Sequence, residues 1–426
     1  MMEQPERGYQ TSDKEVSTIK ILHCIAQLPT RTGSGIYYHN LLRQFAAETD
    51  WEQGALYALP VGGKASNLMA DRKFPVFFGT PSLPFPMPGM SDEMPYPSTV
   101  YHRMDKAQIA AWKSVFRDKL VEIKRVFNPD VVISHHLWML TELVLDVFSD
   151  RPIIGISHGT DIRQAKQHPD LCQTEVGSLR QLTRVLALSA DQVGDLLSCF
   201  DLSSEQIVVT GGAIDTTLFR PTLPLTHRAP GQSVRLVYAG KMVESKGTFE
   251  LVSAFHLALK SDPYLTLDLI GRETDALDDH IDRLFGSDER IRLYDVESQY
   301  QLATHFRRSD VFMFPSYYEG LGLVALEALA SGLSLVTNTL VPLSNQLDRL
   351  ASSAAISWVP MPRLIGLDRI DPDARAAYIP LLAEAILEQA ACRRDASCVA
   401  EHPYQEMASF SWEALARRVR QLIGEL

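Results

Sequence analysis

The chain has 426 residues, and its 41 Lys and Arg residues against 52 Asp and Glu residues give a formal net charge of −11 at pH 7. An acidic chain lacks the basic face that phosphate backbones require, so nucleic acid is not an expected partner. The composition, 46% hydrophobic and 22% charged, is that of a globular protein, and no apolar run is long enough to predict a membrane span.

The N-terminal segment and the cysteines are informative about cellular location. Residues 1–17 are polar, lack the apolar core of a signal peptide and are expected to form a disordered tail. Five scattered cysteines without a CxxC spacing favour reduced thiols over a zinc site. We therefore expect a cytoplasmic protein. Peripheral association with a membrane is left open, although the sequence shows no basic amphipathic helix.

Short apolar strands alternate with helices along residues 18–220, which we expect to form one domain. The predicted strands of this domain are 18–26, 54–59, 131–134, 153–157, 185–188 and 206–209. The predicted helices are 36–47, 105–127, 174–183 and 190–199. Residues 60–100, rich in Pro, Gly, Ser and Met, are interpreted as a long surface excursion, either a lid or an acceptor loop.

A second run of strands and helices follows a predicted linker at 221–233. It forms an expected domain at 234–400, and a C-terminal helix lies within 401–426. The predicted strands are 235–239, 265–270, 290–293, 311–314 and 333–337. The predicted helices are 248–259, 277–285, 299–307, 320–330, 343–350, 373–391 and 410–426. This alternation predicts an α/β protein of two Rossmann-like domains, with ligands bound in a cleft at the carboxyl ends of the strands.

The first candidate motif is the glycine-rich loop Thr32-Gly33-Ser34-Gly35, between the first strand and the first helix. Free amides and the helix dipole at such a position bind anions. A tight turn without a ligand explains the glycines equally well. The loop fails as a dinucleotide fingerprint, because Tyr38 stands where the third glycine belongs. A nicotinamide dehydrogenase is therefore disfavoured.

Two lysines, Lys241 and Lys246, lie in a second loop that directly follows a predicted strand and precedes a helix. Lysines five residues apart at a carboxyl end reach one diphosphate as point charges. The alternative is that both are solvated surface residues.

Histidines follow two of the predicted strands. His158 belongs to the segment His-Gly-Thr-Asp, where the glycine permits a sharp turn and the imidazole could donate to a ligand hydroxyl or transfer a proton. A purely structural role remains the alternative for this lone histidine. For the adjacent His135 and His136, which point to opposite faces in an extended chain, we expect a core or solvated role.

Two carboxylates mark the segment from 309 to 338. Glu327 lies in the middle of a helix that is otherwise apolar, and Glu319 precedes it by eight residues. On one helix this spacing is a little over two turns, roughly 12 Å, which suits two contacts along one extended ligand. The amides of Gly320, Leu321 and Gly322 would sit at the helix N-terminus. A hidden ion pair with Lys or Arg is the alternative for Glu327.

A metal-binding motif is not expected. Asp371-Pro-Asp373 superficially resembles the DxD motif of metal-dependent sugar transferases, but no strand precedes it and a helix follows. Asp at the start of a helix is an ordinary cap. We therefore expect no metal site.

Taken in order, these motifs resemble those of the GT-B glycosyltransferases, most closely the large retaining family 4. The segment PSYYEGLGLVALEALASG resembles the family's E-x7-E motif, and Thr32–Gly35 resembles its glycine-rich donor-phosphate loop. Residues 158–161, 207–221 and 238–255 resemble its HG-x-[DE], domain-exit and phosphate-loop elements. The sequence departs from the family at Lys241, where an Arg is usual, and in TGGAID, which lacks the usual Asn.

The resemblance implies a GT-B fold whose C-terminal helix packs back on the N-terminal domain. It also implies a metal-independent retaining hexosyltransferase. Such an enzyme moves a sugar from a nucleoside diphosphate donor to an acceptor hydroxyl, without a further cofactor. A UDP- or GDP-sugar is the expected donor, and a carbohydrate, a small molecule or a lipid-linked compound is left open as acceptor.

By this resemblance, Lys246 would hold the diphosphate, Glu327 would bind the ribose hydroxyls, and Glu319 with the following amides would orient the sugar. His158 would contact the donor sugar, the Gly35 amide would close onto the phosphates, and Val296 would contact the base through its backbone. The implied catalytic residues are His158, Glu319 and Lys246. The implied donor-binding residues are Gly33, Gly35, Lys241, Lys246, Val296, Glu319, Gly320, Leu321, Gly322 and Glu327.

Three alternatives share this pattern of sequence. A GT-B-like sugar-nucleotide epimerase and a phosphorylase are two of them, and the phosphorylase would need a lysine that carries pyridoxal. The third is a homologue that binds a sugar nucleotide without turning it over.

Overall fold

The computed structural model describes residues 18–30, 32–91, 94–272, 274–296, 298–350, 352–366 and 368–426. The chain divides into two compact units. One holds the residues up to His135 together with Met139–Ile154, and the other holds His136–Trp138 and Gly155–Leu426. The predicted tail at 1–17 lies outside the described residues, and the expected domain boundaries near 220 and 400 stay predictions.

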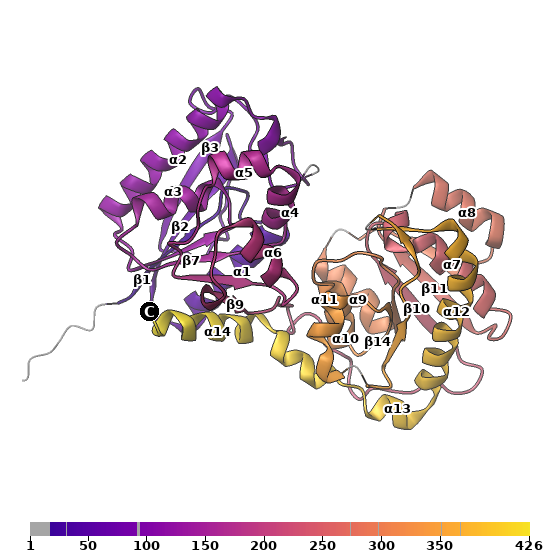
Figure 1. Ribbon diagram of the computed structural model, residues 1–426. Helices are drawn as coiled ribbons and strands as arrows, with labels where there is room; N and C mark the ends of the chain where they lie inside the picture. Colours follow the sequence, from indigo (N-terminus) through magenta and orange to yellow (C-terminus); the bar gives the residue numbers. More distant parts are fainter. Residues whose placement is uncertain are drawn as a thin grey trace, which may run out of the picture. The chain divides into compact units, whose positions relative to one another are not determined.

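A seven-stranded sheet forms the first α/β layer (Figure 1). Its order is β3-β2-β1-β6-β7-β8-β9. The strands are β1 (Lys20–Cys24), β2 (Glu52–Pro60), β3 (Arg72–Phe78), β6 (Val131–His135), β7 (Ile153–Ile156), β8 (Arg184–Ala187) and β9 (Ile207–Val209). The helices of this part are α1 (Gly33–Glu48), α2 (Lys106–Val126), α3 (Met139–Val147), α4 (Thr160–Gln167), α5 (Pro169–Glu175) and α6 (Gln192–Cys199). Short strands β4 (Pro88–Gly89) and β5 (Thr99–Val100) pair separately.

The second sheet has six strands in the order β12-β11-β10-β13-β14-β15. Its strands are β10 (Val234–Ala239), β11 (Leu265–Ile270), β12 (Ile291–Tyr294), β13 (Val311–Phe314), β14 (Ser334–Asn338) and β15 (Ile356–Val359). Its helices are α7 (Thr248–Ala258), α8 (Asp275–Phe285), α9 (Gln299–Arg308), α10 (Leu323–Ala330), α11 (Val341–Gln346) and α12 (Pro372–Arg394). All five strand pairs are parallel. This is the doubly wound Rossmann order, so the predicted α/β class with two Rossmann-like sheets is confirmed.

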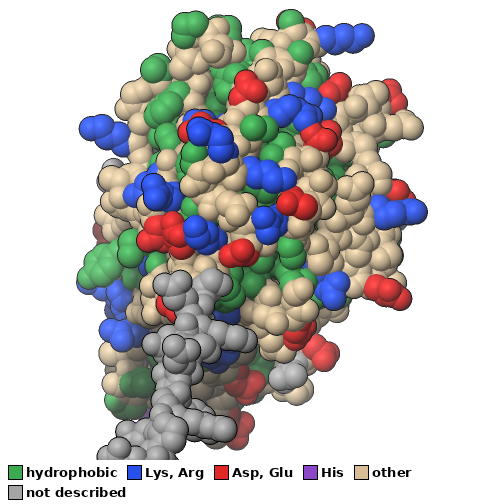
Figure 2. All heavy atoms as spheres, turned by 90° about the vertical axis from the view of Figure 1, so that its left-hand side faces the viewer, with side chains coloured by type: hydrophobic (Ala, Val, Ile, Leu, Met, Phe, Trp, Pro, Cys, Tyr) green, Lys and Arg blue, Asp and Glu red, His purple; other side chains and the backbone are tan. Residues whose placement is uncertain are grey.

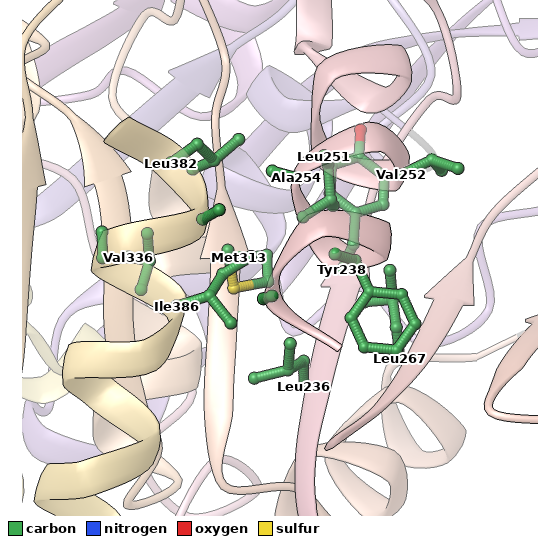
Figure 3. Close-up of a cluster of buried hydrophobic side chains, with 14 of the residues drawn as sticks. Leu236, Tyr238, Leu251, Val252, Ala254, Leu267, Met313, Val336, Leu382 and Ile386 are labelled. Atoms are coloured by element: carbon green, nitrogen blue, oxygen red, sulfur yellow. The ribbon is translucent and has the colours of Figure 1, made fainter. Parts of the chain in front are cut away.

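Helices α7 and α12 pack on one face of the second sheet (Figure 3). Leu236 and Leu267 project from the strands toward Leu251 on α7 and Ile386 on α12. All four of these side chains are fully buried. Burying one such side chain contributes about 1.5–3 kcal/mol relative to leaving it exposed. This packing fixes where the loops at the carboxyl ends of the strands lie.

The C-terminal helix α14 (Trp412–Gly424) follows α13 (Ala396–Ala400) and is amphipathic. Ser411 caps its N-terminus by accepting a hydrogen bond from the amide of Ala414. The Arg418 guanidinium donates to the carbonyl of Thr210 at 2.9 Å, just after β9. The helix thus packs back onto the end of the first sheet, as the resemblance implied.

Three predictions about local structure were wrong. The excursion at 60–100 contains β3, which pairs with β2 along seven residues, so part of it is sheet. The helix predicted at 174–183 is largely absent, because α5 begins earlier, at Pro169, and ends at Glu175. Helix α1 begins at Gly33, not Ile36, so the glycines form its first turn instead of a loop before it.

Charges of both signs are mixed on the face shown in Figure 2. Lys113 of α2 pairs with Glu142 of α3 at 3.5 Å, and Lys124 of α2 pairs with Asp150, which follows α3, at 2.7 Å. Interspersed charges of this kind give no single-sign field for binding nucleic acid, which agrees with the acidic composition.

We predict that Gly247→Ala destabilises the second α/β unit by at least about 2 kcal/mol, because residue 247 has a φ of 66° and an added Cβ would lie 2.3 Å from the carbonyl oxygen of Pro315. Urea unfolding measures the change. Gly194→Ala in α6 is the matched control, since its Cβ meets nothing within 4 Å, and it should gain up to about 1 kcal/mol. Equal stability of the Gly247 variant and wild type would contradict the argument.

Candidate functional site

The strand order of the second sheet reverses between β10 and β13, which lie side by side with Leu236 opposite Val311. In open α/β sheets, ligands bind outside the carboxyl ends of the strands at this point of reversal. Two loops leave the sheet there: residues 240–247 after β10 and residues 315–322 after β13. We call them the lysine loop and the glutamate loop.

The two loops are joined by backbone and side-chain contacts. The Lys246 ammonium lies 2.7 Å from Oε1 of Glu319 and donates to the carbonyl of Tyr318 at 3.1 Å. The amide of Tyr317 donates to the carbonyl of Ser245 at 3.1 Å. Gly247 allows this approach, because any Cβ there would overlap Pro315. The structure thus brings together two of the three residues predicted to be catalytic.

Glu319 and Glu327 do not share a helix. Helix α10 begins at Leu323, three residues later than predicted, and Gly322 caps it with a left-handed φ of 66°. Glu319, Gly320 and Leu321 therefore lie in the glutamate loop, so the expected helical spacing of the two carboxylates was wrong. The amides of 320–322 still precede the helix N-terminus, where free N–H groups and the dipole favour anions.

Glu327 has an unusual environment on α10. Its side chain is half-buried, and the surrounding Ala325, Leu326 and Ala328 are fully buried. Desolvation, and then the nearby Asp215 carboxylate, raises its pKa to about 8. The predicted alternative was a hidden Lys or Arg partner. Among the described residues, the charged neighbour that perturbs this carboxyl is instead another acid.

A buried polar network supports the glutamate loop from behind. The Asn338 side-chain amide, at the end of β14, donates to the carbonyls of Pro315 at 2.9 Å and Ser316 at 3.0 Å. The Tyr378 hydroxyl of α12 donates to Oδ1 of Asn338 at 2.6 Å. Both residues are buried, so the network fixes the loop where water does not compete.

Arg375 of α12 connects the lysine loop to α7. Its Nη2 lies 3.0 Å from Glu244 in the lysine loop, and its Nε lies 2.7 Å from the fully buried Glu250 of α7. Glu250 also interacts with the Tyr317 hydroxyl of the glutamate loop and raises the pKa of that phenol, after the larger effect of desolvation. One guanidinium thus holds both loops through two carboxylates.

Lys241 is exposed at the start of the lysine loop. Its carbonyl accepts a hydrogen bond of 2.7 Å from the Tyr238 hydroxyl at the end of β10. Val296 is half-buried in the loop after β12, as predicted, and packs against the apolar cluster around α9 and α10. Both residues lie beyond carboxyl ends of strands in this sheet, as a donor site requires.

His158 follows β7 and its ring packs 4.8 Å from the ring of His136, which follows β6. The turn around them is organised by Asp161. Its buried carboxylate accepts from the amide of Leu137 at 3.0 Å and from the Ser157 hydroxyl at 2.9 Å. Burial lowers the pKa of His136 to about 4, against the opposing effect of Asp161. His136 is therefore neutral near pH 7.

The first glycine-rich segment is a capped helix start. The Gly35 amide donates to the Thr32 hydroxyl at 2.9 Å, so binding of a phosphate by this amide stays a prediction and would have to replace that bond. A Cβ on Gly35 would lie 2.6 Å from the Leu28 carbonyl oxygen, whereas one on Gly33 would meet nothing within 4 Å. Close packing therefore explains the glycine at 35, whereas no steric contact requires the glycine at 33.

Asp371 caps α12 by accepting from the amide of Asp373 at 2.9 Å, and it pairs with Arg363 at 2.7 Å. The predicted capping role is confirmed. Over the described ranges, no group of three or more His, Cys, Asp or Glu side chains is placed to hold a metal ion.

The sequence reasoning missed several residues of the site. Asp161 and Asp215 lie within motifs that the sequence did reveal. Asp161 is three residues after His158, and Asp215 shortly precedes the predicted linker, so both could have been found. Arg375 and Asn338 gave no such signal, because they are far in sequence from the loops that they hold. For His136, the pairing with His158 depends on the order of strands, which the sequence does not show.

Comparisons with known proteins agree with this geometry. Residues 220–345, which contain both loops, match the family described as glycosyl transferases group 1. A D-inositol 3-phosphate glycosyltransferase of Arthrobacter sp. (strain FB24) is 30% identical over 232 residues, which are 50% of this chain and 55% of that protein. The chain spans 55%, 64% and 62% of three such curated relatives, less than two thirds of each.

Two solved structures cover nearly the whole chain. The sucrose-phosphate synthase of Thermosynechococcus elongatus has a TM-score of 0.63 at 16% identity, covering 96% of this chain and 98% of its own. The UDP-GlcNAc 2-epimerase of Neisseria meningitidis, solved with UDP-GlcNAc, has a TM-score of 0.55 at 12% identity, covering 96% of this chain and 100% of its own. These likenesses show the fold. As a separate finding, the described helices include none long and apolar enough to cross a membrane.

We predict that Arg375→Ala weakens both loops, because it leaves the buried Glu250 without the guanidinium at 2.7 Å. Losing one partner of such a pair costs about 3–5 kcal/mol when both groups are buried, and about 2 kcal/mol is expected here because Arg375 is 40% exposed. Urea unfolding measures it. Arg375→Lys should recover part of the loss, and Arg369→Ala, at an exposed position, is the control. An unchanged Arg375→Ala would contradict the role.

We predict that Glu327→Gln flattens the fall in stability with rising pH. The folded-state pKa of about 8 exceeds the ordinary value of 4.5, so the folded protein binds the extra proton and loses stability as pH rises from 4.5 through 8. At pH 9 the variant should be more stable by on the order of 4 kcal/mol, with little difference at pH 4.5. Urea unfolding at several pH values across this range measures the difference, and Glu384→Gln, at an exposed position, is the control. Parallel curves of stability against pH for wild type and Glu327→Gln would refute the prediction.

Proposed function

We propose that this protein, whose residues 220–345 match the glycosyl transferases group 1 and whose fold is that of the GT-B glycosyltransferases, transfers a sugar from a nucleoside diphosphate donor to an acceptor hydroxyl. The observation that carries the proposal is the junction of the lysine and glutamate loops at the point where the strand order reverses. There Lys246 and Glu319 meet at 2.7 Å.

The charges at this junction suit a leaving diphosphate. As the bond from the anomeric carbon to the diphosphate breaks, negative charge grows on the leaving group and the sugar gains oxocarbenium character. Lys246 and Lys241 would neutralise that charge as point charges, together with the amides of 320–322 before α10. The chain's own cations thus take the part that a metal ion has elsewhere, and we propose a metal-independent reaction of the family 4 type.

Each remaining predicted contact has a defined task in this proposal. Ionised Glu327 would accept hydrogen bonds from the ribose hydroxyls, which supply the polar partners that its apolar helix lacks. Glu319 would turn from Lys246 toward the sugar hydroxyls when the diphosphate binds the lysine. His158 would contact the donor sugar, Val296 the base and Gly33 with Gly35 the phosphates.

Retention of the anomeric configuration and transfer of a hexose are part of the proposal. Attack by the acceptor on the face from which the diphosphate leaves gives retention without a protein nucleophile. A UDP- or GDP-sugar is proposed as donor, in line with the nucleotide sugar bound by one structural relative. The acceptor is a hydroxyl compound, either a carbohydrate, a small molecule or a lipid-linked sugar at a membrane surface.

A direct assay tests the proposal. UDP-, GDP- and ADP-sugars are incubated with the protein, with and without sugar alcohols as acceptors, and the products are followed by proton NMR. Release of nucleoside diphosphate with an anomeric proton of unchanged configuration, and full activity in EDTA, are expected. An inverted product would overturn retention, and loss of activity in EDTA would overturn metal independence.

A sugar-nucleotide epimerase is the second candidate, because one with the same fold covers the chain at a TM-score of 0.55. The same NMR assay separates the two functions. An epimerase converts the donor into a second nucleotide sugar with a changed sugar ring, whereas a transferase releases nucleoside diphosphate. A phosphorylase is tested by an absorbance scan at about 400 nm for pyridoxal bound to a lysine. A protein that binds donor without any product would be a homologue that has lost turnover.

We predict that Lys246→Ala lowers kcat/KM by about 10- to 100-fold, the loss of one hydrogen bond to a charged group, about 1.5–3 kcal/mol. Lys246→Arg should lose less, because it keeps the charge. Initial rates at several donor concentrations measure the effect. Lys260→Ala, an exposed lysine after α7, is the matched control. Unchanged turnover of Lys246→Ala in a folded protein would remove the lysine from the donor site.

A further inference from the structure

A second cluster of cations lies on the sheet that carries the lysine loop, and none of its residues belongs to the lysine loop or the glutamate loop. It surrounds a hollow of about 240 Å³ lined by residues of β10, β11, β12 and α9. The lining residues are Arg235, Asp268, Arg292, Tyr294, His305 and Arg308. We call this hollow the arginine pocket.

The pocket exists because α9 covers only part of its sheet face. Residues that pair in register point to the same face, so Asp268 and Arg292 lie on the face that Val237 of β10 occupies. Beside Val237, the apolar flank of α9 buries the sheet through Ala303 and Phe306. Parallel sheets are usually covered and apolar on both faces. On this face of the second sheet, the side chains are charged where α9 no longer covers the strands.

The pocket carries more positive than negative charge. Asp268 accepts from Nε of Arg292 at 3.1 Å and so compensates one of three guanidinium groups. The Arg235 guanidinium donates to the main-chain carbonyl of Arg308 at 3.3 Å, which brings these two cations to the same side of the pocket. Their positions are exposed, so a ligand can reach them. The convergence of the three groups on one hollow distinguishes them from scattered surface arginines.

Two aromatic rings, those of Tyr294 and His305, also line the pocket. The Tyr294 and His305 rings pack 4.7 Å apart along one wall. Burial lowers the pKa of His305, and of the charged neighbours Asp268 opposes the shift while Arg308 adds to it. The histidine therefore adds little positive charge near pH 7, and its ring nitrogen can donate one hydrogen bond. Guanidinium forks and such a donor together match the oxygens of a phosphate group.

We propose that the arginine pocket binds a small anion that carries one phosphate or a diphosphate, at a site separate from the donor loops. Its volume exceeds the roughly 30 Å³ of a water molecule but falls below the about 300–1,000 Å³ of sites for drug-sized ligands. A phosphate or diphosphate group therefore fits, and a whole nucleotide sugar does not. This inference is independent of the proposed transferase activity.

Titration calorimetry with inorganic pyrophosphate at low salt tests the proposal on the full chain. The proteins are wild type, the double variant Arg235→Ala/Arg308→Ala, the donor-loop variant Lys246→Ala and the control Arg283→Ala, at an exposed position on α8. Circular dichroism melting confirms that each is folded. Both pocket arginines are exposed, so their removal should leave the fold intact.

We expect wild type and Arg283→Ala to bind pyrophosphate alike, and the double variant to lose at least tenfold in affinity at one class of site. Lys246→Ala should keep that class of site, and Arg235→Lys/Arg308→Lys should keep part of the affinity. The proposal is overturned if the double variant binds as wild type does, if Lys246→Ala abolishes all binding, or if wild type binds no pyrophosphate. Loss of the donor site alone would leave this result unchanged, so the two proposals fail separately.

Discussion

The contact between Gly247 and Pro315 is the constraint on which the candidate site depends. With a Cβ at 247 the two loops could not approach, and the Lys246 ammonium would not reach Glu319. The approach is held on three sides. Asn338 fixes the start of the glutamate loop, Arg375 ties the lysine loop to α7, and the adjacent β10 and β13 set the distance between the loop origins. Asn338 and most of the two strands are buried, whereas Arg375 and Glu244 are 40% and 43% exposed and the ion pair itself is 24% and 20% exposed. The buried supports hold the loops where water does not compete, and the ion pair lies where a ligand can reach it.

The two acidic groups of the site, Glu319 and Glu327, differ in how well the protein itself compensates them. Lys246 has Glu319 as its partner, which satisfies a cation that would otherwise face a cluster of helix N–H dipoles. Glu327, in contrast, sits beside Asp215 on an apolar helix, and its pKa of about 8 keeps it largely protonated near pH 7. A ligand that brings a diphosphate and hydroxyl groups would improve both positions at once. Its phosphates would replace Glu319 at the lysine, and its hydroxyls would stabilise Glu327 as a carboxylate. Binding energy and protonation are then linked, because ionising Glu327 releases a proton.

Sequence patterns predicted the parts of the fold that local chemistry decides. Strands rich in Val, Ile and Leu and the helix cap at Asp371 depend on interactions over a few residues. The two Rossmann-like sheets follow from the alternation of strands and helices. The position of Glu327 on a buried helix was also visible, because an acid among apolar residues is a local anomaly. What failed depends on context. The start of α10 was misplaced because Gly322 takes a left-handed conformation that a sequence of glycines and leucines does not reveal. Strand β3 was missed because Pro, Arg and Lys in its sequence mask an edge strand. Arg375 acts across 131 residues of chain through Glu244, and no periodicity predicts such a pair.

The second sheet carries two groups of cations although the chain as a whole is acidic. Like charges within each group repel one another, so each group needs compensation. The two groups solve this differently. In the lysine loop, Glu319 lies within 2.7 Å of Lys246, so the charge is balanced until a ligand arrives. In the arginine pocket, Asp268 balances one guanidinium and leaves a surplus that solvent and salt must screen. A balanced pair favours a ligand that brings both an anion and hydrogen-bond partners for the displaced carboxylate, which is the character of a nucleotide sugar. A surplus of guanidinium groups favours a bare anion, for which no carboxylate has to move. The difference in local charge balance, more than the number of positive charges, is therefore the reason why we propose different ligands for two sites on one sheet.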